Sequence, residues 1–343
     1  MGILKRSLDK SLIQWIMAET GLGPGVGQLH YVAPAASETS LYSTQLGDMG
    51  VEVVDALPSS AFAKAEANRN DVLLVAPGTY TEAAAMDWSK AQTHMLGIGN
   101  PTWRQGGKVR IQSTDTSIVA TVDVTASGVF FGGLNITQNG ADAACLTGLR
   151  LSSTYFSAKK LDIRGMLNSE VAAIEAASCL EFADGSSNGF GSTFVDCNIG
   201  TMSGPARTAT GAACNGVILF AKSTQDGSPG AYTEFHNCRI LSRCEAAGGA
   251  MIKVLDARWG MDRLVYFKDC LVANYWLNYT DNLDGAIYLD ITTGGSGKML
   301  LSNCDLAGVD QWQTQDSGNV LATMPIVGVG GGIEREPTAA TGT

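Results

Sequence analysis

The chain has 343 residues, of which 33 are acidic and 23 are basic, so its formal net charge is −10. A surface that holds a polyanion needs clustered Lys and Arg, so this charge argues against nucleic acid as a partner. Apolar residues make up 45% of the chain and charged residues 16%, which excludes a disordered protein. The longest apolar runs, 72–76 and 326–329, are far shorter than the roughly 20 residues of a membrane-spanning helix. We therefore expect a soluble chain with no membrane partner.

The first element in chain order is a short amphipathic helix at residues 1–20. Its apolar side chains share one helical stripe and are Leu4, Leu8, Leu12, Trp15 and Ile16. A stripe of this kind predicts docking on a partner. A run rich in Gly and Pro at 21–27 ends the helix and predicts a hinge, since no Gly-Lys-Ser/Thr follows that would make it a phosphate loop. Residues 21–58 are thus expected to form a hinge and lead-in.

The N-terminus carries no uninterrupted apolar run and no small-residue cleavage site. It does not have the pattern of a secretory signal, so we expect synthesis in the cytoplasm. The next element is a Ser-capped, Ala-rich helix expected at 59–68. A buried strand at 71–75 follows it, and short β-like runs separated by Gly, Asn, Ser and Thr come after that strand.

An internal repeat dominates the second half of the chain. Four segments share the pattern apolar-x-Asp/Asn-Cys-x-apolar, and they are Phe194–Ile199, Phe235–Ile240, Phe267–Val272 and Leu301–Leu306. Their cysteines recur at spacings of 41, 32 and 34 residues. Two weaker copies, at 131–136 and 158–163, carry Leu at the Cys position. A second strand recurs in phase with the first, at 149–151, 180–182, 217–219, 252–254 and 287–291.

Each copy of the pattern fits a strand that begins at a sharp corner. The Cys and the apolar residue two positions later point to the same side of a strand, so both are expected inside. The Asp or Asn before the Cys is expected at a corner in the left-handed conformation, which Asn, Asp and Gly tolerate. Gly133 fits this reading of its copy, whereas Lys160 does not. The cysteines are expected to be buried thiols and not disulfides.

A period of this size, with short strands and no intervening helices, is typical of a β-solenoid in which successive coils stack. The spacings exceed what three strands and three tight turns need by about ten residues per coil. Long loops are therefore expected at one or two corners of each coil.

With its Val-Ala-Pro-Gly-Thr-Tyr-Thr-Glu run at 75–82 and its repeated Asn/Asp-Cys corners, the sequence resembles the right-handed parallel β-helix proteins of the pectate-lyase-like superfamily. The resemblance covers about residues 50–310. It implies an all-β fold with a parallel β-helix at 59–310. An open solenoid needs a cap, and the helix at 59–68 is the candidate for its front end. The composition of residues 328–343 predicts that the C-terminal segment, 311–343, is a flexible tail. The resemblance also implies a homotrimer, because β-helix proteins of virus particles commonly form one. The fold serves lyases, hydrolases, adhesins and viral structural proteins alike.

Charged residues of the second strand series are the first candidates for chemistry. Arg150, Glu181, Lys253 and Asp290 are expected to point outward. Glu181 and Asp290 would lie three coils, or roughly 14 Å, apart, which exceeds the roughly 5–9.5 Å between the carboxylates of glycosidases. Ion pairs between neighbouring coils, Arg150 with Glu181 and Lys253 with Asp290, are the favoured interpretation.

Two loop segments are candidates for contact with a glycan or a protein. The first contains Asp256, Arg258 and Trp259, whose charges and indole could hold a sugar ring or simply pair with one another. The second contains Tyr275, Trp276 and Tyr279, residue types that are enriched in sugar sites and in protein interfaces alike. Neither segment identifies a ligand.

Metal, cofactor and catalytic sites are not evident. His30, His94 and His236 are scattered, and no Cys pair has the spacing of a zinc site. No motif supports a Ser-His-Asp arrangement. No metal ligand, cofactor or catalytic residue is therefore assigned.

Two functions remain. The first is a non-enzymatic structural protein of a virion, such as a bacteriophage capsid-decorating or tail-associated protein, made in the host cytoplasm and docked on other virion proteins through its N-terminal helix. The second is a tailspike-like polysaccharide lyase or glycoside hydrolase that acts on a host-surface glycan. The first is favoured because the sequence shows no acid pair within one or two coils.

Overall fold

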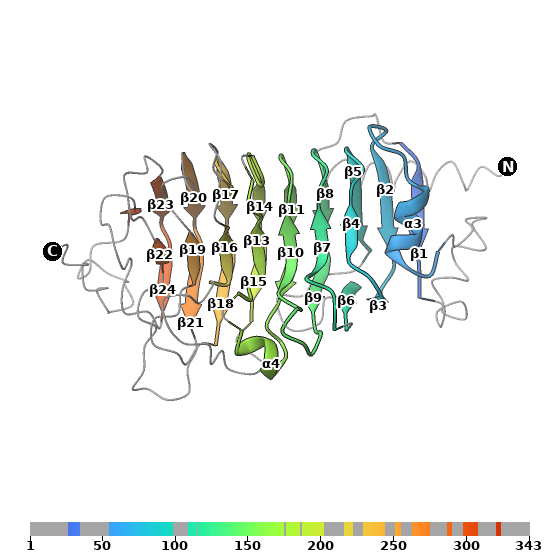
Figure 1. Cartoon of the computed structure of the whole chain (residues 1–343). Coiled ribbons are helices and arrows are strands. Elements are labelled where there is room, and N and C mark those ends of the chain that lie inside the picture. The colour runs from blue at the N-terminus through green and yellow to red at the C-terminus, as the bar shows by residue number, and fades with distance from the viewer. Residues whose placement is uncertain are drawn as a thin grey trace.

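Three parallel sheets wind into a right-handed β-helix in the computed structural model (Figure 1). It describes residues 27–34, 55–98, 109–114, 116–174, 176–185, 187–201, 216–221, 229–243, 251–254, 263–274, 287–289, 298–307 and 320–323. This is the fold expected from the repeat.

Sheet A has ten strands, which are β1 (Leu29–Val32), β2 (Asp71–Val75), β5 (Thr93–Gly97), β8 (Phe130–Gly132), β11 (Ser157–Lys159), β14 (Thr193–Val195), β17 (Thr233–His236), β20 (Leu264–Lys268), β23 (Lys298–Ser302) and β25 (Val320–Thr323). Sheet B has eight, which are β3 (Gly78–Glu82), β6 (Val109–Ser113), β9 (Asn135–Gln138), β12 (Asp162–Arg164), β15 (Asn198–Gly200), β18 (Arg239–Ser242), β21 (Leu271–Asn274) and β24 (Asp305–Ala307). Sheet C has seven, which are β4 (Met86–Trp88), β7 (Ala120–Val124), β10 (Thr147–Leu151), β13 (Leu180–Phe182), β16 (Ile218–Phe220), β19 (Ile252–Val254) and β22 (Ile287–Leu289). Two helices, α3 (Pro58–Lys64) and α4 (Ser169–Ala172), complete the described elements.

Each coil runs from sheet A through a short corner to sheet B, and then through sheet C back to sheet A. The A–B corner takes two residues in most coils, for example 160–161 between β11 and β12. The other two corners are longer: 165–179 separates β12 from β13, and 183–192 separates β13 from β14. Most of the long loops expected from the repeat therefore leave the solenoid at the B–C and C–A corners, although the A–B corner between β5 and β6, at 98–108, is long as well.

The A–B corner holds a column of residues in the left-handed conformation. Their φ angles lie between 51° and 67°, and the residues are Gly133, Lys160, Asp196, Asn237, Asp269 and Asn303. The expected corner geometry is confirmed, and Lys160 conforms to it although its residue type had weakened that copy. The side chains also pair across coils: Asn237 Nδ2 donates to Asp196 Oδ1, and Asn303 Nδ2 donates to Asp269 Oδ1, both at 2.7 Å.

The cysteine after each Asp or Asn forms an interior column. Cys197, Cys238, Cys270 and Cys304 are all buried, and none is in a disulfide. Each thiol lies within hydrogen-bonding distance of a backbone carbonyl, such as that of Phe235 for Cys270. Contact with the Cys238 thiol, together with burial, raises the pKa of Cys270 to about 12. The expectation of buried thiols is confirmed for this column.

Thiol reagents are expected to label none of these four cysteines in the native protein, because reaction requires an accessible thiolate and all four side chains are buried. Labelling with iodoacetamide at pH 8, read site by site by peptide mass spectrometry, checks this. The urea-unfolded chain is the control and should react at all four positions. Rapid native labelling of any of them would show that the side chain faces solvent.

Aromatic rings fill the axis of the solenoid. Neighbouring centroids lie 4.5–5.7 Å apart along the series Trp88, Phe131, Phe156, Phe194, Phe235 and Phe267. The strand position in register with Phe131 and Phe194 holds Ala158 on β11, and the ring of Phe156 fills the space that this small residue leaves. The column is therefore continuous from β4 to β20.

Helix α3 covers the N-terminal end of this column. Phe62 stacks on Trp88 with ring centroids 4.1 Å apart, so the helix extends the aromatic series by one ring. Lys90 Nζ donates to the carbonyl oxygens of Phe62, Ala63 and Ala65 at 2.7–2.8 Å, which satisfies the C-terminal carbonyls of the helix. The helix thus covers the apolar core of the solenoid at this end.

The helix differs from the expected Ser-capped helix at 59–68. Pro58 takes its first position and Leu57 its N-cap, with no side-chain cap. Ser59 instead donates from its backbone nitrogen and its hydroxyl to the carboxylate of Glu82, at 3.1 and 2.7 Å. At the other end the chain becomes extended at Ala65, because the next backbone N–H bonds to the carboxylate of Asp71.

Asp71 anchors the lead-in to the first coil and is fully buried. Its carboxylate accepts hydrogen bonds from the backbone nitrogens of Gln28 and Glu66 and from the guanidinium of Arg69, and it lies 3.4 Å from His30 Nε2. Burial alone would raise the pKa of Asp71, but these bonds outweigh burial and hold that pKa well below its usual range. One carboxylate therefore joins β1, the segment after α3 and β2.

The solenoid extends beyond the expected 59–310 at both ends. Strand β1 lies within the segment interpreted as hinge and lead-in, and β25 lies within the segment interpreted as tail; both join sheet A. The docking stripe of Leu4, Leu8, Leu12, Trp15 and Ile16 lies outside the described residues, as does the rest of 311–343.

Candidate functional site

A row of charged side chains runs across the outer face of sheet C. Asp87 on β4, Asp123 on β7, Arg150 on β10 and Glu181 on β13 occupy the same register position on four successive strands. They point outward because the residues on either side of each, such as Leu149 and Leu151, belong to the core. We call these four residues the charged row.

Arg150 lies between two carboxylates. Its Nε is 3.4 Å from Glu181 Oε1, and its Nη1 is 3.9 Å from Asp123 Oδ2. Asp87 lies one coil beyond Asp123, so two carboxylates are direct neighbours at that end of the row. The row has three acidic groups and one basic group, and its local charge is negative.

Hydroxyl groups of adjacent coils hold each carboxylate of the row. Asp87 Oδ1 accepts from Thr125, Asp123 Oδ1 from Ser152, and Glu181 Oε2 from Thr147, at 2.5, 2.7 and 3.1 Å. Burial raises the pKa of Glu181, while the nearby charge of Arg150 opposes the shift. Burial also raises the pKa of Asp123, the Ser152 hydrogen bond and Arg150 oppose the shift, and the charge of Asp87 adds to it.

The spacing of the row is compatible with two kinds of acid pair. Adjacent coils stack about 4.8 Å apart, so Asp87 and Asp123 are separated by one step and Asp123 and Glu181 by two. Retaining glycosidases place their carboxylates about 5–5.5 Å apart and inverting ones about 6.5–9.5 Å. The expectation that no acid pair lies within one or two coils is therefore wrong.

Sequence reasoning identified half of the row. Arg150 and Glu181 were expected to pair across neighbouring coils, and their contact confirms it. Asp87 and Asp123 were missed because their coils precede the Cys repeat that set the register. The alternation Met-Asp-Trp at 86–88 and Val-Asp-Val at 122–124 was the available signal, since a single charge between two core residues must point outward.

The second expected ion pair, between Lys253 and Asp290, lies only partly within the described residues. Lys253 lies on β19, where it pairs in register with Tyr288 of β22 and is almost fully buried. Asp290 lies outside the described residues. The loop candidates for glycan or protein contact, Asp256, Arg258, Trp259, Tyr275, Trp276 and Tyr279, also lie outside them.

A second polar cluster lies on the outer face of sheet B and is buried. Asp162 accepts from Asn135 Nδ2 at 2.8 Å, from Asn198 Nδ2 at 2.9 Å, and from Arg164 through Nε and Nη2 at 3.0 and 2.5 Å. This carboxylate forms an ion pair with Arg164, and both of its oxygens accept hydrogen bonds. The arrangement stabilises three successive coils and leaves no acidic group for chemistry.

A cavity of about 20 Å³ lies near the B–C corner, and Met166, Cys179, Val217 and Arg243 contribute to its walls. That volume holds about one water molecule, so it excludes a sugar. Among the described residues no three His, Cys, Asp or Glu side chains are grouped as metal ligands. Neither helix in the described part of the chain has the length or the apolar run that a bilayer crossing requires.

Solved structures share the fold of this chain. Pectin methylesterase from Aspergillus niger, in its deglycosylated form, is 13% identical with a TM-score of 0.53, over 93% of this chain and 89% of that one. Pectin methylesterase PemA from Erwinia chrysanthemi is 13% identical with a TM-score of 0.51, over 93% and 94%. The ORF18 protein of Geobacillus virus E2 is 11% identical with a TM-score of 0.40, over 94% and 65%. No family model and no curated protein matches the chain. The likeness shows a right-handed parallel β-helix.

Proposed function

We propose that the chain is a non-enzymatic structural protein of a virus particle, a β-helix of the capsid-decorating or tail-associated kind. One observation carries this: every carboxylate of the charged row is held by a group from a neighbouring coil. A catalytic carboxylate must exchange its proton with a substrate, whereas these groups tie one coil to the next. In this proposal the charged row stabilises the stacking of neighbouring coils on the outer face of sheet C.

The columns of like residues along the solenoid also support a structural role. The corner column, the cysteine column and the aromatic axis repeat through successive coils, which favours a stiff body. The amphipathic stripe at 1–20 and the Gly- and Pro-rich segment after it would dock this body on other virion proteins. Homotrimer formation belongs to the same proposal.

A second candidate function is glycan depolymerisation, as a polysaccharide lyase or glycoside hydrolase. The specific observation in its favour is the charged row itself, with acid pairs at one and two coil steps and two carboxyls whose pKa is raised by burial. Glu181 would then be the general acid and Asp123 the general base, since their separation of two coil steps suits an inverting reaction. Proteins with this fold include the pectin methylesterases, enzymes named for a plant polysaccharide.

Incubation with a panel of bacterial surface polysaccharides separates the two functions. Reducing ends and the absorbance of unsaturated sugars are measured for the wild-type chain and for the Glu181→Gln and Asp123→Asn variants. We expect no turnover by any of the three, together with a small loss of thermal stability in both variants. Asp305→Asn, at an exposed site on sheet B, is the matched control. Sustained turnover by the wild type that Glu181→Gln abolishes would establish the enzyme and overturn the structural role.

A further inference from the structure

The outer face of sheet A changes in character along the solenoid. On its first four strands the outward side chains form a hydrophobic cluster separate from the main core, and they are Leu29, Tyr31, Val72, Leu74, Leu96 and Phe130. We call these six residues the apolar face. From β11 to β17 the outward positions are mostly polar, such as Lys159, Thr193 and Glu234, and they are partly or fully exposed. The first four strands thus differ from the three that follow.

The apolar face is buried from outside the solenoid. Val72 and Leu74 are fully buried, and Phe130 is 8% exposed. Within the described residues the cluster draws on the strands of sheet A and on Ile98, and neither helix contributes to it. Helix α3 packs on the inner side, where Phe62 belongs to the main core. An outward side chain on a sheet is fully buried only when another layer lies above it, so this face requires a cover.

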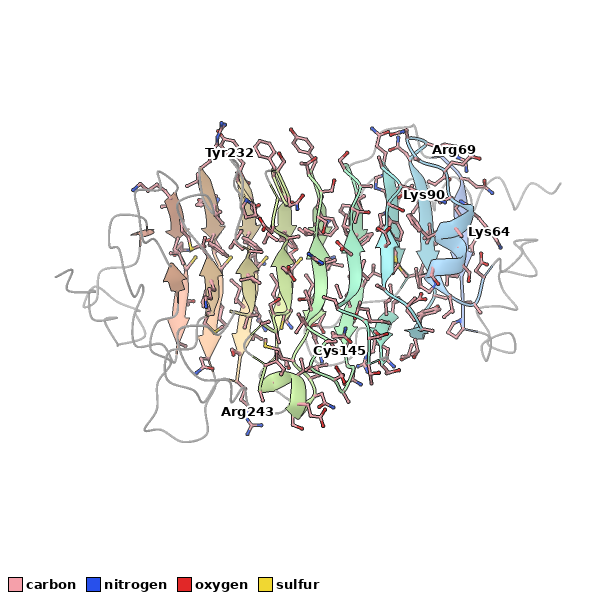
Figure 2. The ribbon with its side chains drawn as sticks, in the orientation of Figure 1. Lys64, Arg69, Lys90, Cys145, Tyr232 and Arg243 are labelled. Carbon is pink, nitrogen blue, oxygen red and sulfur yellow. The ribbon has the colours of Figure 1, made fainter. Side chains whose placement is uncertain are left out.

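The N-terminal segment joins the body at the edge of the apolar face. Gly27 N donates to the carbonyl of Asn70 at 2.9 Å, and a Cβ added at Gly27 would collide with the carbonyl oxygen of Arg69. Arg69 Nη2 donates to Gln28 Oε1 at 3.2 Å, and Figure 2 labels Arg69 at the N-terminal end of the solenoid. Strand β1, the first of sheet A, follows at Leu29. The chain that precedes residue 27 therefore starts beside the face.

The docking stripe matches the apolar face in length. A helix from Leu4 to Ile16 is about 18 Å long, and four strands about 4.8 Å apart span about 14 Å. Residues 21–26 reach about 20 Å when extended, which is enough to carry the expected helix back across the strands. The charges of Lys5, Arg6 and Lys10 lie outside the stripe. A helix with one apolar side can therefore cover the face and keep its charged side in water.

Two other segments outside the described residues adjoin the face in the chain. Residues 99–108 follow Ile98 and contain one large apolar residue, Trp103. Residues 35–54 come soon after β1, and Gly47 and Gly50 interrupt their apolar positions, which disfavours a helix there. The docking stripe has five large apolar side chains between residues 4 and 16. It is the best match to the face among the three.

We propose that the apolar face is the docking site for the stripe of the same chain. A short tether gives the stripe an effective concentration of order millimolar at the face, so docking within one chain precedes association between free chains. If the proposed attachment to virion proteins holds, on which this step rests, the docked stripe is a stored form of the attachment segment. A virion partner must bind the stripe more tightly than the face does. The exchange uncovers the face, which then becomes a second apolar contact with the particle.

Photo-crosslinking of the whole chain tests where the stripe lies. A photoreactive benzoylphenylalanine replaces Leu12 on the stripe, and in the control it replaces Lys10 on the opposite side of the helix. An equal mixture of ¹⁵N-labelled and unlabelled chains is irradiated, digested and analysed by mass spectrometry. From position 12 we expect coupling to peptides that contain Tyr31, Val72 or Leu96, with both peptides from chains of one isotope. Position 10 should not couple to these peptides.

A charge change on the stripe gives a second measurement. Leu8→Asp with Leu12→Asp should leave the far-UV circular dichroism of the β-helix intact and raise the fluorescence of the apolar dye ANS several-fold, because the face becomes exposed. Lys5→Asp with Lys10→Asp is the matched control and should leave dye binding unchanged.

Three results would overturn this docking. They are coupling of position 12 only to 35–54 or 99–108, coupling between chains of different isotope content, which would make a second copy the occupant, and equal dye binding by the stripe variant and its control. No other protein is present in either measurement. Their outcome is therefore independent of whether the chain belongs to a virus particle, which the polysaccharide assay addresses separately.

Discussion

Phe235→Ala is expected to lower the free energy of unfolding by about 3–5 kcal/mol, the range for truncating a buried Phe. The ring is fully buried and stacks on both neighbours in the axial column, with centroids 4.8 Å from Phe194 and 4.5 Å from Phe267. Its removal leaves a cavity that the rigid coils above and below cannot close. Urea unfolding followed by circular dichroism measures the change.

Phe235→Leu is the matched control for this prediction. It keeps most of the volume and loses only the ring stacking, so its cost should stay below about 1.5 kcal/mol. Equal and small effects of both substitutions would contradict a close-packed axis.

Asp71→Asn is expected to lower the free energy of unfolding by about 3 kcal/mol at pH 7, because it removes the charge on which a buried hydrogen-bond network depends. The sign of the pH dependence follows from the depressed pKa of Asp71. Its contribution is complete above the unfolded pKa of roughly 3.9 and is lost as the pH falls below that value towards the native pKa. The difference between wild type and variant should therefore shrink from pH 7 to pH 3.

Glu66→Gln provides the contrast, since Glu66 pairs with the same arginine at the surface. Its Oε2 is 2.7 Å from Arg69 Nη1, but its side chain is 67% exposed. Surface ion pairs contribute little to stability, so this variant should unfold close to wild type at both pH values. A Glu66→Gln effect as large as that of Asp71→Asn would mean that burial does not distinguish the two pairs.

The corner repeat was predictable because the same backbone conformation recurs in each coil and favours the same residue types. The A–B corner needs a left-handed residue followed by an interior side chain, and Asp196-Cys197 and Asn237-Cys238 meet both needs with the same two residue types. Lys160 shows the limit of this reasoning: the corner geometry is imposed by the stacked neighbours, and a residue with no preference for it still adopts it.

A second column of left-handed residues lies at the C–A corner, before successive strands of sheet A, and it was not predictable from residue types. Gln92, Gly128, Tyr155 and Tyr232 share a conformation but no chemistry, so no pattern marks them in the sequence. The charged row was hidden for a different reason. It joins residues from four coils, and the coils of Asp87 and Asp123 lie before the Cys repeat that defines the register. Contacts between coils can be predicted only when the register of each strand against its neighbour is known.

From Asp196 to Asn303 the Asp and Asn side chains of the A–B corner alternate along the column. This alternation determines how many coils can be removed or duplicated together. Asn237 bonds to Asp196, and Asn303 bonds to Asp269, so these four coils form two bonded pairs. Loss of the single coil that carries Asn237 would place Asp196 against Asp269, two like charges about one strand spacing apart. Loss of two adjacent coils keeps an amide next to each carboxylate. A shorter or longer version of this rod is therefore most readily obtained by removing or duplicating coils in twos.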